Sequence, residues 1–243
     1  MKNLKVVLIV LGVGLFFAFN NPPKFLSHSH SIKGEGNAVT KEITLDPFHS
    51  IGLSLDADVI LKQGSPQKVE IDAEANIIDN IKTKVRNGSW NIGFEENVRK
   101  HEKITIYITI PDLKAVSVAG SGDVTTKGAF TGMENLALSI AGSGDLKLEG
   151  EAKSLDISVA GSGDVLMTGS AGKVGVSIAG SGDVNLKDLV AGDCDISIAG
   201  SGNCKVNTSG NLDVSIVGSG DVYYTGGAKV HSSIMGSGDL HEM

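Results

Sequence analysis

Hydrophobic and polar residues alternate along most of the second half of this chain. The segments Leu155–Val159, Val174–Ile178 and Leu212–Ile216 each place an apolar residue at every second position, and shorter segments such as Val165–Met167 follow a few residues later. A period of two with many β-branched residues is typical of β-strands. No unit contains a 3.6-residue period long enough for a crossover helix. We therefore expect an all-β region.

A five-residue motif separates the paired strand segments. It contains Gly-Ser-Gly followed by Asp or Asn, and its copies end at Asp123, Asp145, Asp164, Asp183, Asn203, Asp221 and Asp239. Successive copies are 22, 19, 19, 20, 18 and 18 residues apart. A period near 20 indicates that each unit is one supersecondary element stacked on the next. The pattern predicts a single-stranded right-handed parallel β-helix with coils of about 18–22 residues.

Aligning the coils predicts which side chains share a column. Three columns are expected to face the core: Leu136, Leu155, Val174, Cys194, Leu212 and Val230; Ile140, Val159, Ile178, Ile198, Ile216 and Ile234; and Val124, Leu146, Val165, Val184, Cys204, Val222 and Leu240. One column of serines is expected to face outward: Ser117, Ser139, Ser158, Ser177, Ser197, Ser215 and Ser233.

The repeated motif predicts a sharp corner between two strands. Its two glycines are expected to adopt positive φ, and the following Asp is expected to accept hydrogen bonds from the N–H groups of its own turn. A cation ladder is the alternative, because carboxylates stacked about 4.8 Å apart repel by roughly 1 kcal/mol per neighbour and would favour calcium. That ladder would consist of Asp123, Asp145, Asp164, Asp183, Asp221 and Asp239. No cofactor is expected.

The two cysteines, Cys194 and Cys204, both fall in inward columns where other coils have Val or Leu. We expect them to act as small core hydrophobes. An even number of cysteines also permits a disulfide in a chain that is exported, as the N-terminal segment described next predicts, so a bond between the two within one coil is the alternative. A redox or metal site is disfavoured, because neither His nor a third Cys occurs in the same coil.

The chain divides into four predicted parts. Residues 1–20 have Lys2 and Lys5 before an apolar run, which is typical of a signal peptide or signal anchor. No small-x-small cleavage site follows, so the sequence leaves both outcomes open. Residues 21–31 form a linker, residues 32–115 form irregular N-terminal β layers of the solenoid, and residues 116–243 form the regular repeats. A short helical turn and a hairpin at Asn87-Gly88 are expected in the irregular layers.

Charge and composition exclude some functions. The net charge is −7 and aromatic residues make up 5% of the chain, which disfavours nucleic acid as a partner. From Val116 onward there are 7 Lys, no Arg and 15 Asp or Glu, so this part carries 7 − 15 = −8. An enzyme is disfavoured because Arg occurs only at Arg86 and Arg99, and the outward column after the Asp residues shows no paired carboxylates.

Three segments together resemble a known bacterial family. They are the leader, "PFHSIGLSLDADVILKQG" (47–64), and "ITIPDLKAVSVAGSGDV" (108–124), which opens the repeated AGSGD turns. The chain is similar here to the auto-transporter adhesin head GIN domain family, a domain of unknown function. The resemblance implies a β-helical fold and an envelope or surface location in a Gram-negative bacterium, and it brings no catalytic motif.

The combined expectation is a non-enzymatic, exported, adhesin-like module that binds a glycan or protein ligand at the surface or in the envelope. A periplasmic structural or envelope-maintenance protein anchored by its N-terminal segment is the alternative, and a polysaccharide-active enzyme is a remote one. Membrane contact is expected only through the N-terminal segment. The last coil, which ends in Gly236–Met243, is expected to be covered by end-to-end self-association or by another envelope protein.

Overall fold

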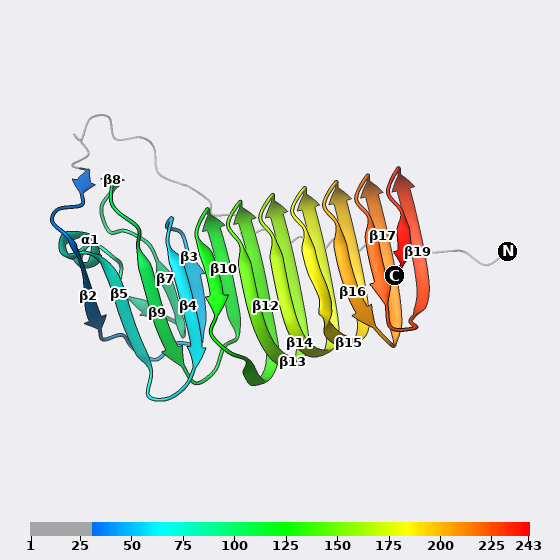
Figure 1. The fold of residues 1–243 in the computed structure, drawn as a ribbon, viewed down its shortest axis with the longest axis horizontal. Helices are drawn as coiled ribbons and strands as arrows, with labels where there is room; N and C mark the ends of the chain where they lie inside the picture. The colour runs from blue at the N-terminus through cyan, green and yellow to red at the C-terminus, as the bar shows by residue number, and fades with distance from the viewer. Residues whose placement is uncertain (1–30) are drawn as a thin grey trace.

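The protein is a parallel β-solenoid whose coils stack along one axis (Figure 1). The computed structural model describes residues 31–243. Strands of each repeat pair in parallel with the equivalent strands of the neighbouring coils. The predicted all-β solenoid is therefore confirmed. The expected signal or anchor segment, residues 1–20, and all but the last residue of the linker lie outside the described residues.

The regular repeats contain eleven strands in chain order. They are β10 (Ala115–Gly120), β11 (Asp123–Thr126), β12 (Phe130–Gly142), β13 (Leu146–Gly161), β14 (Val165–Gly180), β15 (Val184–Gly200), β16 (Cys204–Thr208), β17 (Asn211–Gly218), β18 (Val222–Thr225), β19 (Lys229–Gly236) and β20 (Leu240–Glu242).

The N-terminal layers contain nine shorter strands and one short helix. They are β1 (Ile32–Lys33), β2 (Ala38–Ile43), β3 (Ser50–Leu53), β4 (Asp58–Gln63), β5 (Lys68–Glu74), α1 (Ala75–Asp79), β6 (Val85–Arg86), β7 (Ser89–Ile92), β8 (Val98–Lys100) and β9 (Thr105–Ile110).

The coils are stacked in register, so equivalent residues lie directly above one another. Between β13 and β14, for example, the pairing runs from Leu146↔Val165 to Gly161↔Gly180. Period-two alternation then sends one set of side chains into the core and the other to solvent. The three predicted inward columns are buried, except for Val230, Ile234 and Leu240 of the last coil, which are half-buried.

The coil formed by β19 and β20 is more polar inside than the coils before it. Ser232 aligns with the buried Val214, and Glu242 aligns with Tyr224. Both Ser232 and Glu242 are exposed. Polar residues at core positions suit a coil that faces water, as in the terminal repeats of other solenoids. End-to-end association through this coil stays a prediction.

In the N-terminal layers, the order of the coils differs from the order of the chain. Strand β3 lies between β7 and β10, and β4 lies between β9 and β11, with all four pairings parallel. Counted from the N-terminal end of the solenoid, the second coil contains β3 and β4, which come earlier in the chain. The first coil contains β7 and β9, which come later. The chain then returns to the other side of β3 and β4 to begin the regular repeats. The sequence pattern does not reveal this exchange, because it depends only on where each strand docks.

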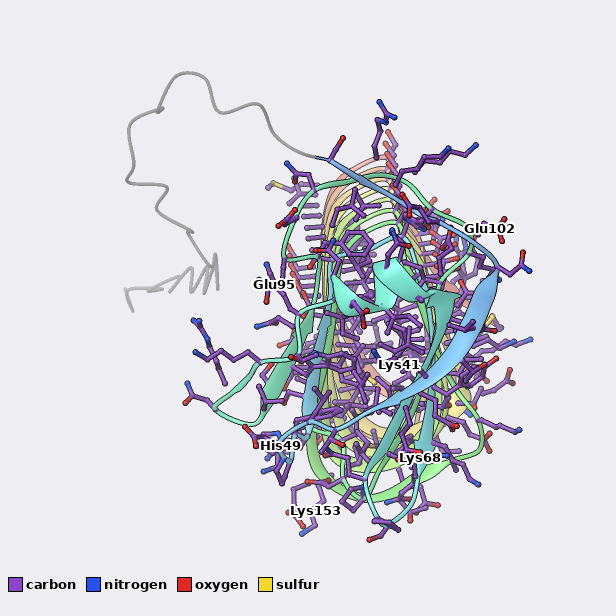
Figure 2. All side chains as sticks on the ribbon, turned by 90° about the vertical axis from the view of Figure 1, so that its left-hand side faces the viewer. Lys41, His49, Lys68, Glu95, Glu102 and Lys153 are labelled. Carbon is purple, nitrogen blue, oxygen red and sulfur yellow. The ribbon has the colours of Figure 1, made fainter. Side chains whose placement is uncertain are left out.

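Antiparallel strands and the helix cover the N-terminal end of the solenoid. Strand β5 pairs antiparallel with β9, and β2 pairs antiparallel with β5. Figure 2 looks at this end and shows α1 and β2, with Lys41, in front of the coils. The predicted short helix is α1, and the predicted hairpin joins β6 to β7 with Asn87 at a φ of 52°. No helix within residues 31–243 is long and apolar enough to cross a membrane.

Candidate functional site

From Gly142 onward, neither glycine of the Gly-Ser-Gly corner has space for a Cβ against the preceding coil, and only the first also has positive φ. The first glycine has positive φ in each repeat, as in Gly142 (144°) and Gly161 (134°). The second glycine has no positive φ, but a Cβ placed on Gly163 would overlap the carbonyl oxygen of Gly144 in the preceding coil. The expectation that both glycines adopt positive φ was therefore wrong. Close stacking of the corners is what excludes a side chain at the second position.

The aspartates that follow the corners bond to the next coil, not to their own turn. The Asp145 N–H donates to Asp123 Oδ1 at 2.9 Å, and the Asp164 N–H donates to Asp145 Oδ1 at 2.9 Å. The same contact joins Asp183 to Asp164 at 2.8 Å. The predicted capping role holds, but the predicted partner was wrong. We call this column, from Asp123 to Asp239, the aspartate ladder.

Asn203 continues the aspartate ladder with an uncharged side chain. Its backbone N–H and its Nδ2 both donate to Asp183 Oδ1, at 2.8 and 3.0 Å. Its own Oδ1 accepts the Asp221 N–H at 3.0 Å. An amide can thus replace a carboxylate here, because the ladder needs only one acceptor per coil.

The aspartate ladder gathers all six aspartates proposed for a cation in one outward column. They are Asp123, Asp145, Asp164, Asp183, Asp221 and Asp239. Within residues 31–243, no group of three or more His, Cys, Asp or Glu side chains is arranged to hold a metal ion. The cation ladder stays a prediction.

A hollow of about 260 Å³ runs beside the aspartate ladder, and we call it the ladder hollow. One wall comes from the ladder and the other from the next outward column. The first wall contains Asp164, Asp183 and Asn203, and the second wall contains Leu166, Asn185 and Lys205.

The second wall continues into an aromatic stack. Tyr223 stacks on His241 with ring centroids 4.9 Å apart, and Lys205 Nζ lies 5.8 Å from the centre of the Tyr223 ring. The Tyr223 hydroxyl donates to Asp221 Oδ2 at 3.4 Å. This pair was not identified from the sequence. The signal was present, since both occupy the second position after the ladder residue.

A second, open hollow of about 270 Å³ lies on the serine face near the last coils. Its lining includes Asp195, Asp213, His231, Ser215 and Ser233. His231 Nδ1 lies 3.6 Å from Asp213 Oδ1, and both side chains are mostly exposed. Exposed pairs of this kind contribute little to stability, and no hydroxyl of the serine column is hydrogen-bonded to this histidine within residues 31–243.

The cysteines are buried free thiols in the regular repeats. Burial raises the pKa of Cys194 to about 11, with a smaller opposing effect from the Thr208 hydroxyl beside it, and burial raises the pKa of Cys204 further above its ordinary value. Their position in the core matches the expected role as small hydrophobes. The alternative disulfide between Cys194 and Cys204 is not formed in the structure, and pairing under oxidising conditions stays a prediction.

In-register coils, a repeated Gly-Ser-Gly-Asp corner and a filled apolar interior define a repeat protein of the β-solenoid class. Residues 47–228 match the family described as "Putative auto-transporter adhesin, head GIN domain", and the chain belongs to this family. The resemblance noted in the sequence is therefore confirmed. The family description points to an exported protein. No curated protein matches the chain.

Solved structures that share the fold include two adhesins and a lipid binding protein, each named as putative. A putative adhesin from Bacteroides fragilis has 23% identity and a TM-score of 0.80, with 88% of this chain and 100% of that chain covered. A putative adhesin from Parabacteroides merdae has 24% identity and a TM-score of 0.77, with 88% and 99% covered. A putative lipid binding protein from Parabacteroides distasonis has 25% identity and a TM-score of 0.74, again with 88% and 99% covered.

Proposed function

We propose that this chain is an exported, non-enzymatic, adhesin-like module that binds a ligand at the cell surface or in the envelope. The observation that carries the proposal is the outer surface of the solenoid, where the serine column and the aspartate ladder run unbroken over the repeats. Such columns present polar groups at a fixed spacing without any ordering cost on binding. The family description and the two adhesin structures support the same function.

The arrangement of charged groups favours a binder over a polysaccharide-active enzyme. Ladder carboxylates such as Asp145 and Asp164 use one oxygen to hold the next coil, which ties them to the fold. Both arginines, Arg86 and Arg99, lie in the N-terminal layers, away from the two hollows. A glycan-cleaving site needs two carboxylates placed on either side of the scissile bond, whereas the two carboxylates of each hollow, Asp164 and Asp183 or Asp195 and Asp213, belong to one stacked column.

The lipid-binding name of one related structure is a weaker guide for this chain. Core columns that include Ile157, Ile196 and Val206 fill the interior of the repeats. An acyl chain would therefore have to lie on the outside, where each of the two hollows contains two carboxylates.

A structural role in the periplasm is the second candidate, because the aspartate ladder and the stacked corners make a stiff rod. Protease treatment of intact and permeabilised cells separates the two functions. We expect digestion of the protein on intact cells, while a tagged periplasmic control protein stays protected. Protection of this protein until permeabilisation would contradict ligand binding at the cell surface and favour the structural role.

A further inference from the structure

The ladder hollow is shaped by the lengths of the side chains in its second wall. In successive coils this column contains Lys147, Leu166, Asn185 and Lys205. The two lysines are exposed, whereas Leu166 and Asn185 are half-buried. The hollow is lined from Leu166 to Lys205, so it spans two coil steps of about 4.8 Å, or about 10 Å in all. This length suits one or two sugar rings.

The hollow offers both acceptors and donors. Asp164 and Asp183 each use Oδ1 for the ladder, and within residues 31–243 their Oδ2 atoms make no hydrogen bond to protein. Asn185 contributes an amide and Lys205 an ammonium group on the facing wall. Neighbouring hydroxyl groups of a sugar both donate and accept, so they match carboxylate oxygens on one side and N–H groups on the other.

The charges of the hollow favour an uncharged ligand. Asn203 interrupts the series of carboxylates and donates to Asp183, while Lys205 adds a positive charge to the same place. The hollow is therefore less acidic than the rest of the aspartate ladder, which disfavours a basic peptide. The remaining carboxylates disfavour sulfated or sialylated sugars. Leu166 adds an apolar surface against which the C–H face of a sugar ring can pack.

We propose that the ladder hollow binds an uncharged sugar unit of a glycan. The carboxylates of Asp164 and Asp183 accept hydrogen bonds from sugar hydroxyls, and Asn185 and Lys205 donate to other sugar oxygens. This inference rests on the proposed binding function and specifies the ligand class and its site.

The experiment compares two tryptophan substitutions in β15. Asn185→Trp fills the hollow from its second wall, whereas Val190→Trp places the same ring at an exposed position outside it. Purified proteins are applied to an array of neutral oligosaccharides with sialylated and sulfated counterparts, and the best neutral oligosaccharide is then titrated by calorimetry. We expect wild type and Val190→Trp to bind equally and Asn185→Trp to lose about tenfold or more in affinity.

A side-chain truncation provides a second test if circular dichroism shows that Asn185→Trp does not fold. Lys205→Ala removes a donor with little change in packing, and we expect a several-fold loss in affinity for the same oligosaccharide. Neutral binding that survives these substitutions unchanged, or a preference for anionic glycans, would overturn the inference. If no glycan binds but the protein still adheres to cells, the inference is wrong while the proposed function stands. If the protein neither binds a glycan nor adheres to cells, both the inference and the proposed function are wrong.

Discussion

The regular repeats hold neighbouring coils together with one contact used many times, whereas the N-terminal layers use contacts that occur once. In the repeats, each ladder residue accepts the N–H of the next coil, as Asp145 does from Asp164. In the N-terminal layers, the Asn80 side chain donates to the Glu96 carbonyl and accepts the Glu96 N–H. Gln63 Nε2 donates to the Pro111 carbonyl of the same layers and to the Thr131 carbonyl of β12. A repeated contact makes any single copy replaceable, while a unique contact has no substitute nearby.

This difference predicts where substitutions do most harm. A solenoid is stabilised by neighbour-to-neighbour terms, so damage in one coil affects the adjacent coils most. The chain contains a single tryptophan, Trp90, and it lies in the N-terminal layers. Its fluorescence therefore reports on these layers, while circular dichroism reports on all the strands. The two signals together separate the two regions.

The largest effect is expected from Trp90→Ala. This side chain is fully buried, packs against Phe48 with ring centroids 5.6 Å apart, and donates from Nε1 to the Lys82 carbonyl at 2.7 Å. We expect a loss of about 3–5 kcal/mol in the free energy of unfolding, measured by guanidinium denaturation followed by circular dichroism. If Trp90→Ala lowered the free energy of unfolding by less than a valine-to-alanine change in a repeat column, the N-terminal layers would not be the more sensitive region.

The next largest effect is expected from Gly163→Ala. The added Cβ would overlap the Gly144 carbonyl and lie 2.9 Å from Ile140 Cγ2, so the corner must shift. We expect a loss of about 2–3 kcal/mol, while Ser162→Ala, its exposed neighbour, should change stability by less than about 0.5 kcal/mol. The circular dichroism transition should move more than the Trp90 fluorescence transition. Equal shifts would show that the two regions unfold as one unit.

Asn80→Ala tests a contact found only in the N-terminal layers. Asn80 Nδ2 donates to the Glu96 carbonyl at 2.9 Å, and the Glu96 N–H donates to Asn80 Oδ1 at 3.0 Å. We expect a loss of about 2 kcal/mol and faster hydrogen exchange at Glu96. Asn97→Ala, at an exposed position beside it, is the matched control and should leave that exchange rate unchanged.

The buried thiols predict how the repeats respond to high pH. The pKa of Cys194 is raised from 9.0 to about 11, so above 9.0 the unfolded chain loses this proton before the folded one does. The free energy of unfolding should therefore depend little on this group well below pH 9.0 and should fall as the pH rises towards 11. The expected loss is about 1 kcal/mol between about pH 8 and about pH 10. A Cys194→Ala variant should lack this component in denaturant titrations.

The smallest effect is expected from Asp145→Asn. Its Oδ1 accepts the Asp164 N–H, and the amide of Asn203 already performs this role elsewhere in the ladder. The change in unfolding free energy should stay within about 0.5 kcal/mol, while Asp145→Ala should cost about 1 kcal/mol because the N–H loses its acceptor. A large loss with Asp145→Asn alone would show that charge, and so a bound cation, matters to the ladder.

The regular repeats could be predicted almost residue by residue, because spacing and alternation act locally. The inward positions of Val159, Val184 and Ile216 follow directly from the alignment of the corners. What the alignment could not show was the partner of each ladder aspartate. Only the backbone geometry shows that the N–H group bonded to each carboxylate belongs to the next coil.

The N-terminal layers could be predicted only as β-rich. The docking of β3 between β7 and β10 depends on contacts between segments far apart in the chain, and no period marks it. The buried Glu74, which accepts the Glu102 N–H at 3.0 Å and leaves no room for a side chain on Gly34, likewise has no sequence signal. Of the candidate site, the ladder was predicted, and the hollow was not.

The exchanged order of the first two coils has a consequence for how the molecule assembles during synthesis. The coil of β3 and β4 emerges first but needs neighbours on both sides, and the outer neighbour, β7 and β9, is complete only at Ile110. Assembly therefore begins with a nucleus that closes late and over long sequence separations, which is the slow kind of step. From Ala115 onward each coil can add to a finished template as it appears, so growth runs in one direction, in the order in which the ribosome or an export channel delivers the chain.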